Sequence, residues 1–218
     1  EIWSFCYAKE KNVPAEHRGE LGFGDVYTWT AICADTKLCA SWLVGKRDAD
    51  YAIAFIDDLA GRLANRIQLS TDGLHAYLQA VDKAFGGKID YGVLIKMYGA
   101  PQYPERRYSP AQFTGSMKRR ITGDPYLKEV STSFVERQNL TMRMQMRRFT
   151  RLTNGFSKKI ENLEHAVALH FMHYNFARIH QKLRVTPAME AGVSDHVWTL
   201  EEIAGLVDSV PELWAKAA

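Results

Sequence analysis

The order of apolar patterns along this chain of 218 residues predicts an α/β fold, in which helices flank a mixed sheet. Three strand-like runs come first, and the segments between them are too short for a crossover helix, which predicts an antiparallel meander. Helical and strand-like patterns then alternate up to residue 98, as expected for strands that continue the sheet in parallel. The final third of the chain has only helical patterns.

Each strand and helix is assigned from its own residues. The expected strands are rich in aromatic and β-branched side chains, and they cover 1–9, 25–34, 37–44, 67–70 and 90–98. The expected helices repeat apolar residues three and four positions apart. They cover 48–66, capped by Asp48; 74–85; 131–151, opened by Ser131; 157–180; a short segment after Pro187; and 199–207, with Thr199 and Glu202 as a capping box.

The segment 99–125 is expected to be a long basic loop, because it holds four prolines and shows no clear period. A loop of this length inside a compact domain is either functional or disordered. The complete order of elements is compatible with a ribonuclease-H-like topology, in which carboxylates meet at strand ends and on a following helix. We therefore expect one ribonuclease-H-like domain over 1–185, with 99–125 inserted, and a helical tail over 186–218.

Positive charge is concentrated in one part of the chain. The net charge is +3, but the segment 106–160 holds 13 Lys and Arg against three acids, a net of +10, and the remainder is mildly acidic. This distribution indicates a polyanionic partner, nucleic acid before membrane. No apolar run reaches the roughly 18 residues of a membrane span. The three cysteines lie in strand-like stretches without metal-ligand spacing, which is typical of reduced thiols, so we expect a cytoplasmic protein.

The predicted helix 131–151 combines one acid, Glu136, with five arginines. Arg143, Arg147 and Arg151 are four positions apart and would share a face of a continuous helix. A carboxylate at the head of such a helix can hold a divalent cation while the arginines hold a phosphate backbone. The alternative is a surface helix with a solvated basic face, on which Glu136 complements the helix dipole.

Asp72 is the strongest single candidate for chemistry, because it follows a buried strand and precedes Gly73 and a helix. Sites in open α/β sheets form beyond the carboxyl ends of such strands. The alternative is that Asp72 only caps the helix 74–85. Together with Glu136, however, Asp72 predicts a magnesium site, because one or two carboxylates and substrate phosphates usually hold Mg²⁺. Two such ions catalyse in-line displacement at phosphorus, normally with a third carboxylate from the first strand.

Other candidate ligands are expected to be structural. Each of the histidines His75, His170, His173 and His180 is expected to be packed or exposed to solvent rather than bound to a metal. Three methionines, Met142, Met144 and Met146, occupy every second position of a predicted helix, so at least one should be exposed.

Several segments resemble the DDE-type transposases of the bacterial insertion-sequence one (IS-one) family. These segments are EIWSFCYAK (1–9), STDG (70–73) and VERQNLTMRMQMRR (135–148). The segment HYNFARIHQKLRVTPAMEAG (173–192) is similar to the one that closes many transposase and integrase catalytic domains. The similarity covers nearly the whole chain, in the right order. It implies a ribonuclease-H-like fold, a carboxylate triad that binds Mg²⁺ or Mn²⁺, and DNA cleavage and strand transfer at mobile-element ends.

The resemblance also implies roles for single residues. Asp72 matches the second acid of the triad and Glu136 the third, and Arg137, Asn139 and Arg143 match polar positions that follow the third acid. The first acid would fall immediately before Glu1, so we expect an N-terminally truncated catalytic core with impaired catalysis. The family's N-terminal DNA reader would also lie outside this chain. The 64 positions between the two acids make a wide gap, which 99–125 would explain as an insertion.

The implied partner is double-stranded DNA, at the element's terminal repeats and at the target. A homodimer or higher oligomer is expected because two ends must be paired, and the expected location is the bacterial cytoplasm, on the nucleoid. The residues predicted to contact DNA are Arg143 and Arg147, then Lys118, Arg119 and Arg120 in the predicted loop, together with Arg137 and Asn139.

Two other functions remain open from the sequence. The basic block also fits a non-catalytic DNA-binding or oligomerisation module derived from a transposase, whose DNA binding would depend on salt and not on Mg²⁺. A structure-directed nuclease on the same fold would share the acids, but it would hydrolyse strands without joining them.

Overall fold

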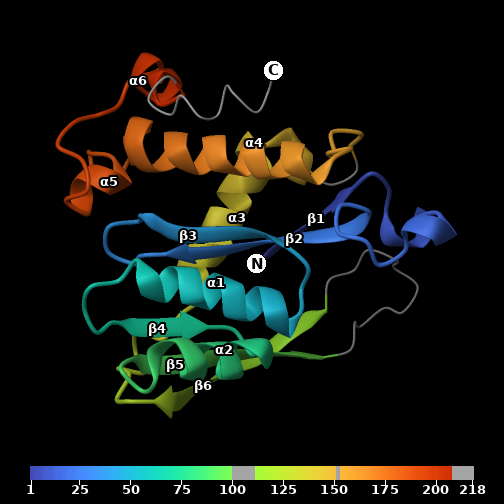
Figure 1. Ribbon diagram of the computed structural model, residues 1–218. Helices are drawn as coiled ribbons and strands as arrows, with labels where there is room; N and C mark the ends of the chain where they lie inside the picture. Colours follow the sequence, from blue (N-terminus) through green and yellow to red (C-terminus); the bar gives the residue numbers. More distant parts are fainter. Residues whose placement is uncertain (100–110, 151–152, 208–218) are drawn as a thin grey trace. The chain divides into compact units, whose positions relative to one another are not determined.

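The computed structural model describes residues 1–99, 111–150 and 153–207, and these form a mixed α/β structure (Figure 1). In this described part, six strands form two three-stranded sheets. The chain divides into two compact units: unit 1 is Glu1–Lys46 with Asn139–Ala218, and unit 2 is Arg47–Gln138. The predicted domain boundary at residue 185 stays a prediction.

The sheet of unit 1 is the predicted antiparallel meander. Its strands are β1 (Ile2–Cys6), β2 (Gly24–Ile32) and β3 (Cys39–Gly45), paired in that order. Burial alternates along β1, where Ile2, Ser4 and Cys6 are buried and the residues between them are half-buried. One face of this sheet therefore belongs to the core of unit 1.

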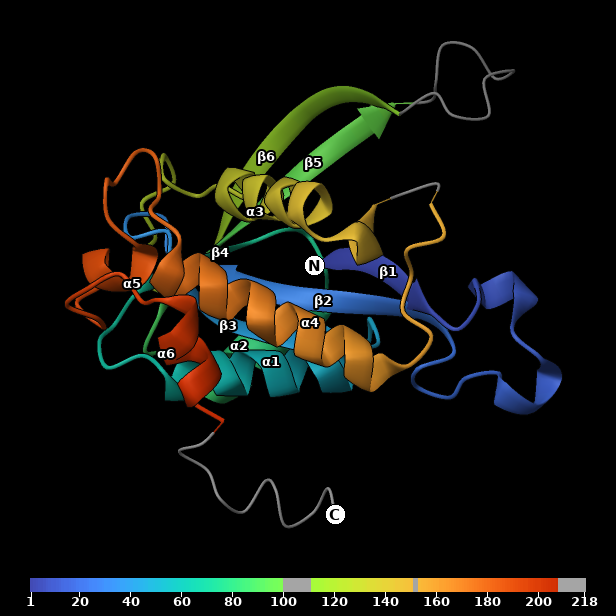
Figure 2. The same ribbon diagram turned by 90° about the horizontal axis from the view of Figure 1, so that it is seen from above.

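The helix α4 (Ile160–Met172) lies along one face of this sheet (Figures 1 and 2). Its buried side chains Leu163, Val167 and Phe171 pack in one cluster with apolar residues of all three strands. Two residues of α3 (Ser133–Gln145) and its continuation, Met142 and Met146, complete the cluster. Met144 between them is 76% exposed, which confirms that one of the three methionines faces solvent.

The predicted helix 157–180 begins at Ile160 and closes as a π-helical turn, His173–Ala177. This turn ties the C-terminal segment to β3. The Asn175 side chain accepts from the backbone N–H of Cys39 and donates to its carbonyl, each at 3.0 Å. The short helices α5 (Pro187–Glu190) and α6 (Leu200–Gly205) follow, and the predicted capping box of Thr199 with Glu202 is confirmed.

Unit 2 combines two helices with the second sheet. Its elements are α1 (Ala49–Gly61), β4 (Gln68–Thr71), α2 (Ala76–Phe85), β5 (Asp90–Gly99), β6 (Gln112–Thr122) and the start of α3. Asp48 caps α1 as predicted, because its Oδ1 accepts from the Tyr51 N–H at 3.0 Å. The strands β4 and β5 are parallel, as predicted. They do not continue the meander of unit 1, however, because they form a second three-stranded sheet with β6, so the prediction of one mixed sheet is wrong.

The prediction of a loop over 99–125 is wrong for 112–122, which form the strand β6, antiparallel to β5. Nearly all side chains of β6 are exposed, so its sequence lacks the apolar alternation that marks a half-buried strand. Backbone pairing with the edge of β5 forms the strand instead. Figure 2 shows β5 and β6 as a long, curved ribbon. The remaining part of the predicted loop, 100–110, lies outside the described residues.

The prediction of one continuous helix over 131–151 is also wrong. The helix α3 ends at Gln145, the backbone of Met146 is extended, and Arg147–Phe149 forms a 3₁₀ turn. This break lets both Met146 and Phe149 enter the core of unit 1. Arg147 packs over Gly155, where an added Cβ would lie 2.6 Å from Arg147 Cγ. Arg143 and Arg147 therefore do not share a helix face, and Arg151 lies outside the described residues.

The burial of His170 predicts a loss of stability in mild acid. Its side chain is nearly buried, and burial together with the charges of His173 and Arg178 lowers its pKa from 6.5 to about 4. The unfolded chain therefore binds a proton between these two values that the folded chain does not, and stability falls as the pH falls through this window. We expect His170 to contribute about 2 kcal/mol of destabilisation between pH 7 and pH 5.

The measurement compares the wild type with His170→Phe by urea unfolding at pH 7 and pH 5. The variant should lose much of the pH dependence, whereas the exposed control His165→Phe should keep it. If the pH dependence of the unfolding free energy is unchanged in His170→Phe, the pKa of His170 is not lowered in the folded protein.

Candidate functional site

An open hollow of about 670 Å³ lies in unit 2, where β4 ends. Asp72 and the next three residues line it from the carboxyl end of β4, and Leu94, Ile95, Lys96 and Tyr98 line it from β5. Glu136 lines it from the start of α3, Thr132 from the residue before that helix, and Arg47 from the segment before α1. The two acids that the sequence singled out, 64 positions apart, thus line one cavity, and we call it the acidic hollow.

Asp72 is held by the turn that leaves β4. Its side chain is exposed, and Oδ1 accepts from the Leu74 N–H at 3.0 Å. The helix α2 begins only at Ala76, and no side chain caps its first turn, so Asp72 orders the turn rather than the helix. A hydrogen bond between Thr71 Oγ1 and the Tyr91 hydroxyl oxygen, which are 2.8 Å apart, holds the end of β4 against β5.

The pKa of Tyr91 depends on the groups around this turn. Burial raises its pKa, the Thr71 hydrogen bond lowers it, and the negative charge of Asp72 raises it further. The Tyr91 hydroxyl therefore stays neutral and acts as a fixed hydrogen-bonding group beneath the hollow.

Packing against β5 positions the segment that carries Glu136. Val130 is fully buried against Gly92, where an added Cβ would lie 2.5 Å from Val130 Cγ2. Any larger residue at position 92 would push this segment away from the strand. The Gln68 side chain clamps the same segment, because its amide accepts from Tyr126 N–H at 2.7 Å and donates to Tyr126 O at 3.3 Å. These contacts set the start of α3 beside β5.

Glu136 is oriented by two neighbours. Thr132 Oγ1 donates to Glu136 Oε1 at 2.6 Å, and the ammonium of Lys96 on β5 binds the same oxygen. Partial burial raises the pKa of Glu136, but the hydrogen bonds from Lys96 and Thr132 and the charge of Lys96 outweigh it, so the pKa is lowered. The carboxylate is therefore ionised at neutral pH.

Sequence reasoning missed Lys96 and Thr132. Lys96 carried a usable signal, since it is the charged residue inside the otherwise apolar strand pattern DYGVLIKMY. A lysine placed there needs a partner or solvent. Thr132 directly precedes α3 and resembles an ordinary capping residue, so its contact with Glu136 could not be read from the pattern.

The acidic hollow has the donor chemistry that a hard divalent cation requires. Asp72 and Glu136 offer carboxylate oxygens, which Mg²⁺ prefers. In the described part of the chain, Oε2 of Glu136 and Oδ2 of Asp72 have no hydrogen bond, so each carboxylate retains an oxygen for a cation. Among these same residues no three His, Cys, Asp or Glu side chains form a group. A cation held by this pair would need its other ligands from phosphate, water or a further acid.

Three predicted DNA contacts lie together on β6. Lys118, Arg119 and Arg120 are all exposed, and they alternate between the two faces of the ribbon. Lys118 Nζ donates to the Lys128 carbonyl at 2.9 Å, and Arg120 pairs with Asp124 at 3.0 Å. These contacts are at the surface, where ion pairs are weak and exchange with other partners at little cost.

The other predicted contacts follow Glu136 along the chain. Arg137 is exposed on α3, in unit 2. Asn139, Arg143 and Arg147 belong to unit 1, where Asn139 Nδ2 donates to the Glu1 carbonyl at 3.4 Å. Arg143 is half-buried and Arg147 is exposed.

Comparison of the chain with protein-family models, curated proteins and solved structures gave no match. Among the described helices, none has the length and apolar character to cross a membrane.

Replacement of Lys96 by methionine tests the electrostatics of the acidic hollow. Removing the ammonium should raise the pKa of Glu136, because the hydrogen bond and the charge that favour the carboxylate are lost. The measurement is an NMR titration of the Glu136 side-chain carboxyl carbon. Lys128→Met, at an exposed position of the same unit, should leave this pKa unchanged. An unshifted pKa in Lys96→Met would mean that Lys96 does not contact Glu136 in solution.

Proposed function

We propose that this chain is the catalytic core of a DDE-type transposase, which cleaves DNA and transfers strands at the ends of a mobile element. The observation that carries the proposal is the convergence of Asp72 and Glu136 on one open hollow at the carboxyl end of a parallel strand. These are the two positions that match the second and third acids of the IS-one family. The order of three antiparallel strands and then the parallel pair β4 and β5, here in two sheets, is the strand order along the chain that a ribonuclease-H-like fold would have.

In this proposal, Asp72 and Glu136 would hold Mg²⁺ or Mn²⁺. The bound ion would activate the attacking hydroxyl and stabilise the charge that develops at the phosphate. Residues of this chain prepare the two ligands: the Leu74 N–H orients Asp72, and Thr132 and Lys96 keep Glu136 oriented and ionised. The first acid, which the resemblance places before Glu1, would complete the ligand set.

The ribbon of β5 and β6 supports DNA as the partner. Its three consecutive basic residues, Lys118, Arg119 and Arg120, belong to the same unit as the acidic hollow and are open to solvent. Such side chains neutralise phosphates without reading sequence. We extend the proposal to double-stranded DNA, to an oligomer that pairs two element ends, and to a cytoplasmic, nucleoid-associated protein.

A DNA-binding module without catalysis is the second candidate. The Lys96 ammonium, bound to Glu136, already supplies a positive charge where a cation would sit. If this ion pair persists on DNA, the acidic hollow is structural, and the chain binds DNA without cutting it.

The test is cleavage of a duplex that carries an element end, by the chain with one Asp added before Glu1. With Mg²⁺ or Mn²⁺ we expect nicked and joined strands. Asp72→Asn or Glu136→Gln should slow the reaction by about 100-fold or more, because each removes a cation ligand worth several kcal/mol of charge stabilisation. The matched control is Asp82→Asn, at an exposed position on α2 outside the hollow.

Equal cleavage by the wild type and the Asp72→Asn variant would refute the proposal. Hydrolysed ends without joined strands would indicate a nuclease instead. DNA binding without any metal-dependent cleavage would favour the second candidate.

A further inference from the structure

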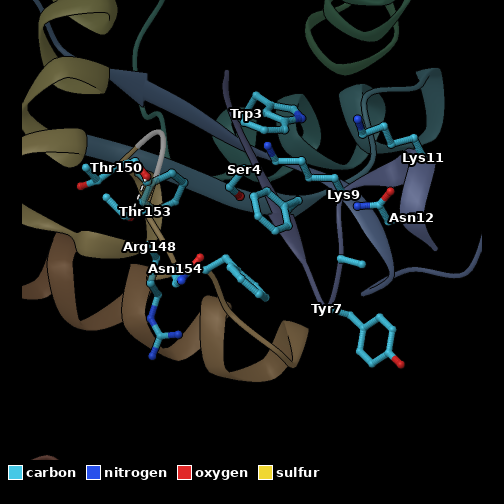
Figure 3. A pocket seen from close by; sticks show the side chains of 14 residues that line it. Trp3, Ser4, Tyr7, Lys9, Lys11, Asn12, Arg148, Thr150, Thr153 and Asn154 are labelled. Carbon is cyan, nitrogen blue, oxygen red and sulfur yellow. Dashed lines mark hydrogen bonds between the residues drawn. The ribbon is translucent and has the colours of Figure 1, made fainter.

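A second hollow, of about 610 Å³, lies in unit 1 between the N-terminal residues 3–12 and residues 148–150 with 153–156 (Figure 3). It shares no residue with the acidic hollow. Five of its lining residues are aromatic, and we call it the aromatic hollow. Figure 3 shows Trp3, Lys9 and Lys11 toward one end and Arg148 with Asn154 toward the other.

The strand geometry of β1 creates the aromatic wall. Residues at every second position point to one face, so Trp3 and Phe5 lie opposite the buried Ile2, Ser4 and Cys6. The ring centroids of Trp3 and Phe5 are 5.8 Å apart, and those of Phe5 and Phe156 are 4.7 Å apart. All three rings are only half-buried. A row of large apolar rings thus remains open to solvent instead of entering the core.

Two lysines flank one end of this row, and an arginine lies at the other end of the hollow (Figure 3). Lys9 Nζ lies 6.0 Å from the Phe5 ring centroid, and Lys11 is exposed beside it. Arg148 is fixed by its hydrogen bond to Ser157 Oγ at 2.7 Å. Glu10, between the two lysines, turns its carboxylate away, because Oε2 accepts from the Asp25 N–H at 3.1 Å. Within the described residues, no acid lines the hollow.

The combination of open rings and cations selects one kind of occupant. An apolar peptide would bury the rings but would leave the lysines without a counter-charge. A DNA duplex would satisfy the lysines, but its bases are stacked on each other and cannot offer their faces to Trp3 and Phe5. An unpaired nucleotide satisfies both groups, since its base stacks on an aromatic ring and its phosphates meet the lysines.

We propose that the aromatic hollow binds an unpaired nucleotide of a DNA strand, with the base against Trp3 and Phe5 and the flanking phosphates at Lys9 and Lys11. This inference rests on the proposed function for its choice of DNA, and it adds a site for single-stranded segments of the substrate. It needs no metal, so it can be tested separately from cleavage.

The experiment measures fluorescence anisotropy of labelled single strands of about ten nucleotides with the wild-type chain, in EDTA. An oligothymidylate is compared with an abasic strand of the same length and charge. The wild type should bind the oligothymidylate at least about fivefold more tightly, the contribution of one base–aromatic stack. Trp3→Leu should abolish this preference, and Trp3→Phe, which keeps a ring, should retain it.

Charge variants test the lysines. Lys9→Gln and Lys11→Gln should each reduce the dependence of log Kd on log salt concentration by about 0.7, the value of one phosphate contact on a single strand. Lys182→Gln, exposed in the same unit but outside the hollow, should leave the slope unchanged.

Two results would overturn the proposal. One is an equal affinity of the wild type for the thymidylate and abasic strands, and the other is a base preference that survives in folded Trp3→Leu. The assay is run in EDTA, so a failure of the metal-dependent cleavage proposal would leave this result intact. Conversely, loss of the base preference in Trp3→Leu alone would support the aromatic hollow whether or not the acidic hollow cuts DNA.

Discussion

The strand β5 is the constraint on which the acidic hollow depends. It pairs with β4 over only its first four residues, but it pairs with β6 to its end at Gly99. Because β4 stops at Thr71 while β5 continues, Asp72 emerges beside an open stretch of strand that carries Lys96. Gly92, near the start of β5, accepts Val130 and so determines where α3 begins. One strand thus positions both carboxylates and carries the lysine that binds Glu136.

Within the proposed function, Lys96 would give the acidic hollow two different electrostatic states, one without DNA and one with it. Paired with Lys96, Glu136 is ionised but its charge is compensated, so the hollow attracts a cation less than two free carboxylates would. Phosphates that approach along β6 would compete with Glu136 for the ammonium. Arrival of DNA would then release Glu136 for a cation, which links the two partners through a single lysine.

The aromatic hollow differs from the acidic one in its acids and in its rings. It combines five aromatic residues with cations and has no acid among the described residues that line it, whereas the acidic hollow combines two carboxylates with Arg47 and Lys96. Within the proposed function, the first kind of site suits the bases and phosphates of a displaced strand, and the second suits the phosphate at which chemistry occurs. The two sites can therefore fail independently, and their variants separate binding from cutting.

Local signals in the sequence predicted the parts of the structure that depend on local physics. The alternating pattern of β1, the cap at Asp48 and the capping box at Thr199 all lie within a few residues of what they determine. The strand β6 was not predicted, because its pairing with β5 and not its own apolar pattern makes it a strand. The break after Gln145 was not predicted for a similar reason, since the core of unit 1 draws in both Met146 and Phe149.

The residues of the candidate site also fall into those marked by local sequence and those set by contacts between distant segments. Asp72 and Glu136 could be named from a strand end and a helix start, together with the resemblance to a known family. Thr132 could not be named, and the sequence marked Lys96 only as a charge within an apolar strand pattern, because their contacts with Glu136 form only once β5 and the start of α3 meet.

The central claim is that Asp72 and Glu136 act as one cation site. The most direct test is to measure the affinity for Mn²⁺ by electron paramagnetic resonance. Asp72→Asn, Glu136→Gln and the double variant form a cycle. If both carboxylates hold the same ion, each single change should weaken binding and the double change should add little, with a coupling of about 0.5–3 kcal/mol. Strictly additive losses, or unchanged binding in either single variant, would contradict a shared site.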